Sequence, residues 1–235
     1  MRFKKIQKLF EKGNVCVVGL KGTGKDVLFG NVVARRNKPY ISNTYYCKGL
    51  IPFRYEDIAV AGNNYKGFID NKLKHYDFPF ADGTDVYLAD AGVYFPSQYC
   101  NELNREFKEM PTYQALSRHL GESNFHVNVQ NLNRVWDKIR EQSDTYILCK
   151  SCKVLFGKFV IQRVILYDKY QSCVDRVKPW KIKLPLIASK EMRLSCDIAR
   201  QQYENSHGTV KAVWLIYRNK SKHDTRVFKE MMADA

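Results

Sequence analysis

The stretch "GLKGTGKD" has the residue types and spacing of a loop that binds phosphate, which are a glycine, four residues and then Gly-Lys. Glycines carry no side chain, so their backbone N–H groups can turn inward and line an anion nest. Lys25 supplies a mobile positive charge for the β- and γ-phosphate oxygens. The stretch predicts a nucleotide site with these contacts: Gly19, Lys21, Gly22, Thr23, Gly24, Lys25, Asp26 and Val27.

Asp26 stands where such a loop normally has Ser or Thr, whose hydroxyl binds Mg²⁺. A carboxylate is also a good hard-oxygen ligand for Mg²⁺, directly or through water. It repels phosphate when the metal is absent, so we expect nucleotide binding to depend steeply on Mg²⁺. The alternative is that Asp26 caps the following helix and does not touch the metal.

Asp90 ends the apolar stretch "DVYLADAG", which is typical of a buried strand. Its carboxylate is expected to emerge near the glycine loop and to hold the Mg²⁺ shell, unless it only caps the turn before Gly92. In many motor ATPases the next residue is a Glu that polarises water, but here it is Ala91. Either hydrolysis is slow or another acid is the base, with three candidates: Glu102, Glu109 and Glu122.

Gln130 closes the alternating stretch "NFHVNVQ", and a polar side chain at that strand end can touch the γ-phosphate or orient water. An arginine finger, supplied by a neighbouring copy, has three candidates in Arg118, Arg134 and Arg140. Surface ion pairs explain each of these arginines equally well.

The elements that must position these residues alternate between strand and helix. Strands are expected at 14–20, 38–46, 84–92, 124–130 and 145–149, and helices at 3–13, 26–37, 67–76 and 132–143, with helical material at 97–121. This order predicts an α/β fold of the P-loop NTPase type, with a mostly parallel central sheet flanked by helices. Residues 1–150 form the expected ATPase core. Residues 151–235 form a basic, β-rich extension packed on it, beginning with a hairpin at 153–170.

The charge of the chain is uneven. The net charge is +15, and residues 150–235 hold 18 basic against 8 acidic residues. Such a surplus indicates an anionic partner, such as nucleic acid or an acidic membrane surface, or serves solubility alone. Trp180, among Lys178, Lys181 and Lys183, could stack on bases of single-stranded DNA.

The seven cysteines and the absence of a long apolar run provide information about the cellular compartment of the protein. We expect reduced thiols in a cytosolic compartment, no signal peptide and no membrane span. Cys149 and Cys152 have the spacing of a zinc knuckle, which Cys173 and Cys196 could complete. We favour buried thiols without a metal, because the second pair lacks matching spacing.

Three ordered stretches resemble the Zot-like (zonular occludens toxin) family of filamentous-phage assembly ATPases, related to the DNA pumps of the FtsK–HerA type. They are "GLKGTGKD", "VYLADAGVYFPSQY" and "LSRHLGESNFHVNVQNLNRVWDKIREQSD", within about residues 12–150. The resemblance implies a Walker A ATPase with ATP and Mg²⁺ that moves single-stranded or other phage DNA in packaging, assembly or extrusion. It matches Asp90, Gln130 and Arg140 to the family's motifs, whereas Asp26 and Ala91 depart from them.

The resemblance further implies a homo-oligomeric ring in the host cytoplasm, held at the inner face of the membrane by a separate membrane-bound assembly partner. Two alternatives stay open. One is a small-molecule kinase of the nucleoside monophosphate type, although no arginine-rich lid is evident. The other is a structural morphogenesis protein that hydrolyses ATP weakly, which Ala91 favours.

Overall fold

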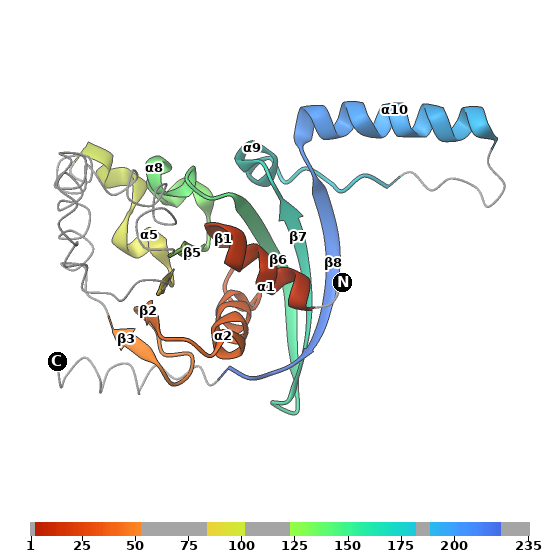
Figure 1. Cartoon of the computed structure of the whole chain (residues 1–235). Coiled ribbons are helices and arrows are strands. Elements are labelled where there is room, and N and C mark those ends of the chain that lie inside the picture. The colour runs from red at the N-terminus through yellow and green to blue at the C-terminus, as the bar shows by residue number, and fades with distance from the viewer. Residues whose placement is uncertain (1–2, 53–83, 102–122, 182–188, 222–235) are drawn as a thin grey trace, which may run out of the picture.

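One eight-stranded sheet organises the chain, of which the computed structural model describes residues 3–52, 84–101, 123–181 and 189–221 (Figure 1). The strand order is β3-β2-β4-β5-β1-β6-β7-β8. Strands from β3 to β6 pair in parallel, and β7 and β8 add antiparallel pairs at one edge. The strands are β1 (Val15–Val18), β2 (Tyr40–Ser42), β3 (Leu50–Pro52), β4 (Asp85–Leu88), β5 (Phe125–Val129), β6 (Thr145–Leu155), β7 (Phe159–Tyr167) and β8 (Val210–Arg218).

Helices cover both faces of the parallel strands, which explains why those strands read as continuous apolar runs. On one face lie α1 (Phe3–Lys12) and α2 (Lys25–Arg36), and α1 turns Phe3, Ile6 and Phe10 into the core. The opposite core is built around Trp136, which is fully buried. Its short elements are α5 (Ala91–Tyr94), η1 (Ser97–Tyr99), η2 (Leu132–Arg134), α8 (Asp137–Arg140) and α9 (Tyr170–Val174).

The predicted α/β fold with a mostly parallel sheet is confirmed, but the helix expected at 132–143 is wrong. Val135 is extended, Trp136 is also non-helical, and together they separate η2 from α8. Val135 forms a bridge with Pro96, and Trp136 buries its ring, so tertiary contacts override local helix propensity here. The helix expected at 67–76 and most of the helical material at 97–121 lie outside the described residues.

The antiparallel edge contains the predicted hairpin. Strands β6 and β7 are joined by a turn in which Phe156 and Gly157 both have positive φ, as tight hairpin turns require. The predicted domain boundary at residue 150 falls inside β6, which belongs to the same sheet on both sides of that residue. The division into two domains stays a prediction.

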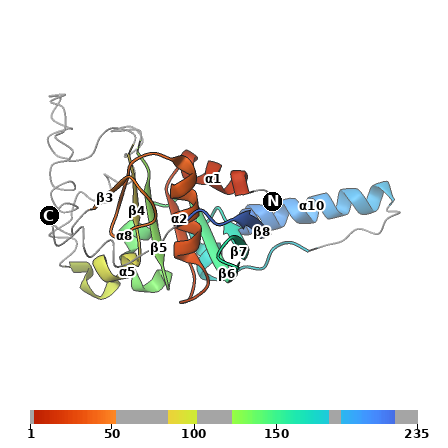
Figure 2. The same cartoon turned by 90° about the horizontal axis from the view of Figure 1, so that it is seen from below.

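The sequence did not predict α10 (Lys190–His207), the longest described helix, within the extension expected to be β-rich. The Ser189 side chain accepts a hydrogen bond from Met192 N and caps its first turn. No residue of α10 is buried, and the helix extends away from the sheet in both views (Figures 1 and 2). None of the helices in the described ranges is long and apolar enough to span a bilayer.

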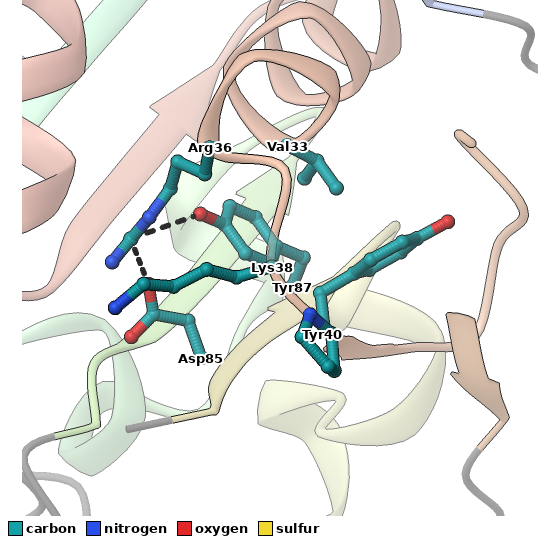
Figure 3. A pocket seen from close by; sticks show the side chains of 7 residues that line it. Val33, Arg36, Lys38, Tyr40, Asp85 and Tyr87 are labelled. Carbon is teal, nitrogen blue, oxygen red and sulfur yellow. Dashed lines mark hydrogen bonds and ion pairs between the residues drawn. The ribbon is translucent and has the colours of Figure 1, made fainter. Parts of the chain in front are cut away.

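A buried polar network ties α2 to the amino-terminal edge of the sheet (Figure 3). Asp85, at the start of β4, pairs with Arg36 of α2 and accepts a hydrogen bond from Asn124 N at 2.9 Å. Arg36 also donates to the Tyr87 hydroxyl at 3.3 Å. The cavity beside them has a volume of about 10 Å³, room for about one water molecule, so this network is structural.

Candidate nucleotide site

The glycine loop lies between β1 and α2, at the carboxyl edge of the sheet. Gly22 and Gly24 have φ of 80° and 86°, a region that favours glycine. Gly19 N donates to Val129 O at 3.1 Å, which ties the loop to the end of β5. The Thr23 hydroxyl donates to Leu20 O at 2.7 Å and so closes the turn. The predicted strand, loop and helix are therefore all present.

Donors without partners gather at this loop. No described residue accepts a hydrogen bond from the backbone N–H groups of residues 20–22 and 24–27. Lys25 is only 6% exposed, and among the described residues no hydrogen bond or ion pair engages its ammonium group. Free backbone N–H groups at the start of a helix, with a lysine beside them, are the arrangement that binds anions, so they indicate an anion-binding site at the start of α2. Val27 follows within the first helical turn, whereas Lys21 is exposed at the loop tip.

Asn128 joins the two predicted metal ligands. Its amide Nδ2 donates to Asp26 Oδ1 at 2.8 Å, and its Oδ1 accepts from Asp90 N at 2.8 Å. Asn128 lies on β5 and is fully buried. The structure therefore brings Asp26 and Asp90 together beside the loop, through a residue that the sequence analysis did not single out.

Further contacts hold the Asp26 carboxylate and the backbone just before Asp90. The Tyr46 hydroxyl donates to Asp26 Oδ1 at 3.3 Å. The pKa of Tyr46 is raised, mainly because the side chain is buried and also because the negative charge of Asp26 is close. Asn43 exchanges two hydrogen bonds of 2.8 Å with the backbone of Ala89. Asp90 itself is exposed and adopts φ 48°, a conformation that Asp tolerates better than most residues.

The donor set fits a magnesium ion. Within the described residues, no group donates to Asp26 Oδ2 or to either carboxylate oxygen of Asp90. Neither side chain caps a helix, which is the alternative role considered for each. Mg²⁺ commonly takes one or two carboxylates and fills its shell with water and phosphate oxygens. Asp26 and Asp90 are the residues that could hold it.

Two cavities border Gln130, and the larger of them also touches the glycine loop. One, of about 190 Å³, is lined by Asp90, Gln130 and Arg134, among others. The other, of about 360 Å³, has walls that include Thr23, Gln130 and Arg176. Gln130 thus borders both cavities at the end of β5, where the sequence predicted it to meet the γ-phosphate or water.

Arg140 does not join this group. Its guanidinium donates to Leu132 O at 2.9 Å and to Val135 O at 3.3 Å, and it lies over the Tyr170 ring. These bonds hold the loop between η2 and α8, and the role of Arg140 as an arginine finger for a neighbouring copy stays a prediction. Arg134, in contrast, borders the cavity that contains Asp90. The remaining candidates lie outside the described residues: Glu102, Glu109, Arg118 and Glu122.

Gln162 supports the loop from the antiparallel strands, and the sequence analysis missed it. Its amide Nε2 donates to Gly24 O at 3.0 Å and to Thr23 O at 3.3 Å. Its Oε1 accepts from the Tyr217 hydroxyl of β8 at 2.9 Å. Gln162 is fully buried, and a buried amide needs hydrogen-bond partners. A glutamine inside the apolar stretch "FVIQRVILY" was therefore the sequence signal that could have indicated this role.

Cys149 and Cys152, which have zinc-knuckle spacing, lie next to the loop. Cys149 is buried and its Sγ accepts from Gln162 Nε2 at 3.4 Å. Burial raises the pKa of the Cys152 thiol, which keeps it protonated. Across the described part of the chain, no group of three or more His, Cys, Asp or Glu side chains is placed to share a metal ion.

No protein-family model and no curated protein matches the sequence. Solved structures show distant similarity. The N-terminal domain of zonular occludens toxin from Neisseria meningitidis is 14% identical, with 92% of this chain and 97% of that chain covered and a TM-score of 0.43. The genome packaging NTPase B204 from Sulfolobus turreted icosahedral virus 2, in complex with AMP, is 16% identical, with 75% and 99% covered and a TM-score of 0.41.

EssC (ATPases 2 and 3) from Geobacillus thermodenitrificans is 11% identical over 96% of this chain and 43% of that chain, with a TM-score of 0.45. The topology of the chain itself defines its class. A parallel sheet with β1 at its centre, followed by the glycine loop and α2, is the α/β fold of P-loop NTPases.

Proposed function

We propose that this protein binds ATP with Mg²⁺ and hydrolyses it to move phage DNA in packaging, assembly or extrusion. The observation that carries the nucleotide part is the link through Asn128. It holds Asp26 and Asp90 together beside a loop in which the N–H groups of residues 20–22 and 24–27 and the Lys25 ammonium have no partner among the described residues.

Each residue has a distinct task in the proposed reaction. The loop N–H groups bind the phosphates, and Lys25 places its charge on the β- and γ-phosphate oxygens. Asp26 and Asp90 would hold Mg²⁺, which would supply positive charge to those oxygens. Gln130, at the edge of both cavities, orients the attacking water, and Arg134 supplies positive charge on the Asp90 side.

The DNA part of the proposal has separate support. The chain has a net charge of +15, which favours a polyanionic partner. The ordered motifs that resemble the Zot-like family support an assembly motor that acts as a homo-oligomeric ring. Under this proposal the ring works in the host cytoplasm, at the inner face of the membrane, through a membrane-bound assembly partner.

Ala91 favours a second candidate, a morphogenesis protein that binds ATP and hydrolyses it weakly. Ala91 is fully buried in the core, so this position offers no room for a water-polarising carboxylate. The left-handed turn at Asp90 directs the chain inward at that point. The described residues include no acid that takes the place of the missing Glu in the cavity beside Asp90.

Steady-state ATP turnover tests these candidates. The full chain is assayed with and without Mg²⁺ and with and without single-stranded DNA, next to Lys25→Ala. Lys8→Ala, which removes an exposed lysine on α1, is the matched control. A motor predicts Mg²⁺-dependent turnover that DNA raises, that Lys25→Ala abolishes and that Lys8→Ala leaves unchanged.

Other outcomes have clear meanings. Binding of a fluorescent ATP analogue without turnover would refute the motor and support the weakly hydrolysing protein. Equal analogue binding by the native chain and Lys25→Ala would contradict the nucleotide site itself. Phosphate transfer to nucleoside monophosphates would instead indicate a kinase.

A further inference from the structure

At the antiparallel edge of the sheet, no element of the described ranges covers one face near the turn between β6 and β7. Side chains of β7 and β8 that point to the α1 and α2 side are buried, including Val160, Val213 and Leu215. Near the turn between β6 and β7, the alternate side chains of the three strands point the other way, and all of them are exposed except Ile161, which is half-buried. We call this surface the open face, and its residues are Lys153, Leu155, Phe159, Ile161, Arg163, Trp214, Ile216 and Arg218.

The open face carries large apolar side chains that a water-facing sheet does not need. Trp214 is 57% exposed, Ile216 is 70% exposed and Phe159 is 51% exposed. Exposed apolar patches of this kind mark binding surfaces. Trp and Phe rings present flat faces on which another ring can stack.

Positive charge is distributed among these apolar side chains. The register aligns three rows across the strands, and each row holds one cation. Arg163 stands beside Trp214, Lys153 stands opposite Ile161, and Arg218 stands beside Phe159. The Arg163 guanidinium lies over the Trp214 ring, with 5.9 Å to its centroid.

The three strands contain no acidic residue. Residues 145–167 and 210–218 hold six basic side chains and neither Asp nor Glu. A partner of this surface must therefore be anionic and must also offer flat apolar groups. Successive rows on a strand are about 6.6 Å apart, since each residue rises about 3.3 Å.

We propose that the open face binds single-stranded nucleic acid, with its bases stacked on Trp214 and Phe159 and its phosphates on Lys153, Arg163 and Arg218. Stacking platforms within a basic surface are the general solution for single strands, because every base has a π-face. A lipid interface fits less well, since it separates apolar from charged side chains, whereas here they are interleaved.

The position of the open face links this nucleic-acid site to the proposed ATPase function. Its biological role rests on that proposed function. Strands β7 and β8 carry the open face on one side and Gln162 and Tyr217, which support the glycine loop, on the other. The polymer would therefore lie one sheet thickness from the loop. This site also differs from the predicted contact at Trp180, whose ring packs near Tyr203 at 5.3 Å between centroids.

The test is binding of a fluorescently labelled oligothymidylate to the full chain without nucleotide, followed by anisotropy. Trp214→Ala should weaken binding roughly tenfold, and Trp214→Phe should keep most of the affinity. Arg163→Ala should reduce the slope of log affinity against log salt by about 0.7. Lys8→Ala on α1 should change neither quantity, and a duplex of equal length should bind more weakly.

Three results would overturn the proposal. The first is unchanged oligothymidylate affinity in Trp214→Ala. The second is loss of affinity in Trp180→Phe but not in Trp214→Ala. The third is binding to phosphatidylglycerol vesicles, sensitive to Trp214→Ala, without binding to the oligonucleotide. Lys25→Ala separates the two proposals, because it should abolish ATP turnover and retain oligothymidylate binding.

Discussion

Gly24 and Gly22 form a matched pair for testing how closely β6 presses on the glycine loop. Both have positive φ, of 86° and 80°. A Cβ added at Gly24 would lie 2.4 Å from Cys152 Cβ and 2.6 Å from its Sγ, whereas one added at Gly22 would have nothing within 4 Å. Only the substitution at position 24 therefore adds a steric overlap to the backbone strain.

The expected magnitudes differ accordingly. In Gly22→Ala the left-handed backbone costs about 1–2 kcal/mol. In Gly24→Ala the same strain is joined by overpacking, typically about 1–3 kcal/mol, so the free energy of unfolding should fall by about 2–5 kcal/mol. The gain from restricting the unfolded chain is common to both variants and cancels in their difference.

Urea denaturation followed by circular dichroism measures both free energies, and titration with a fluorescent ATP analogue measures the site. A double-mutant cycle with Cys152→Gly isolates the contact, and its coupling energy should be about 1–3 kcal/mol. Equal destabilisation by Gly22→Ala and Gly24→Ala, with no coupling to Cys152, would refute the close contact between β6 and the loop.

Three further predictions concern the buried polar groups. Asp85→Ala should lower the free energy of unfolding by about 3–5 kcal/mol, because it leaves Arg36 without its buried partner, and Asp85→Asn should cost less; urea denaturation checks both. Gln162→Leu should cost about 1–3 kcal/mol and weaken binding of the ATP analogue, whereas Tyr217→Phe, which keeps the bonds from Gln162 to the loop, should change that binding less. Burial holds the pKa of His126 well below its ordinary value of 6.5, so below that pH the unfolded chain takes up a proton that the folded chain does not. Stability should therefore fall by up to about 1.4 kcal/mol per pH unit as the pH drops from 6.5 towards the folded pKa, and His126→Asn should lack this component in denaturation curves recorded from pH 7 to 5.5.

Local sequence signals were sufficient to predict motifs whose residues lie close together along the chain. The glycines, Lys25 and the flanking apolar runs predicted the strand, loop and helix that the structure contains. The hairpin of β6 and β7 was predicted in the same way, by alternation around a Gly-containing turn. Such patterns need no knowledge of distant contacts.

The missed features depend on distant contacts. Asn128 gains its role only because β5 lies between β4 and β1. The polar alternation of His126, Asn128 and Gln130 was visible, but only the fold shows that Asn128 meets Asp26. The prediction of one helix at 132–143 was wrong for the same reason, because the burial of Trp136 between η2 and α8 depends on tertiary contacts.

The support of the glycine loop by Gln162 and Tyr217 has a consequence for the order in which the chain is made. A ribosome synthesises residues 19–26 early, but Gln162 and Tyr217 emerge much later. Contacts across such long sequence separations form late and slow folding. Until β7 and β8 have joined the sheet, the loop lacks the amide that holds the carbonyl groups of Thr23 and Gly24. The nascent chain should thus acquire its nucleotide site only after β8 has been synthesised and has joined the sheet, when the strands that carry the open face are also in place.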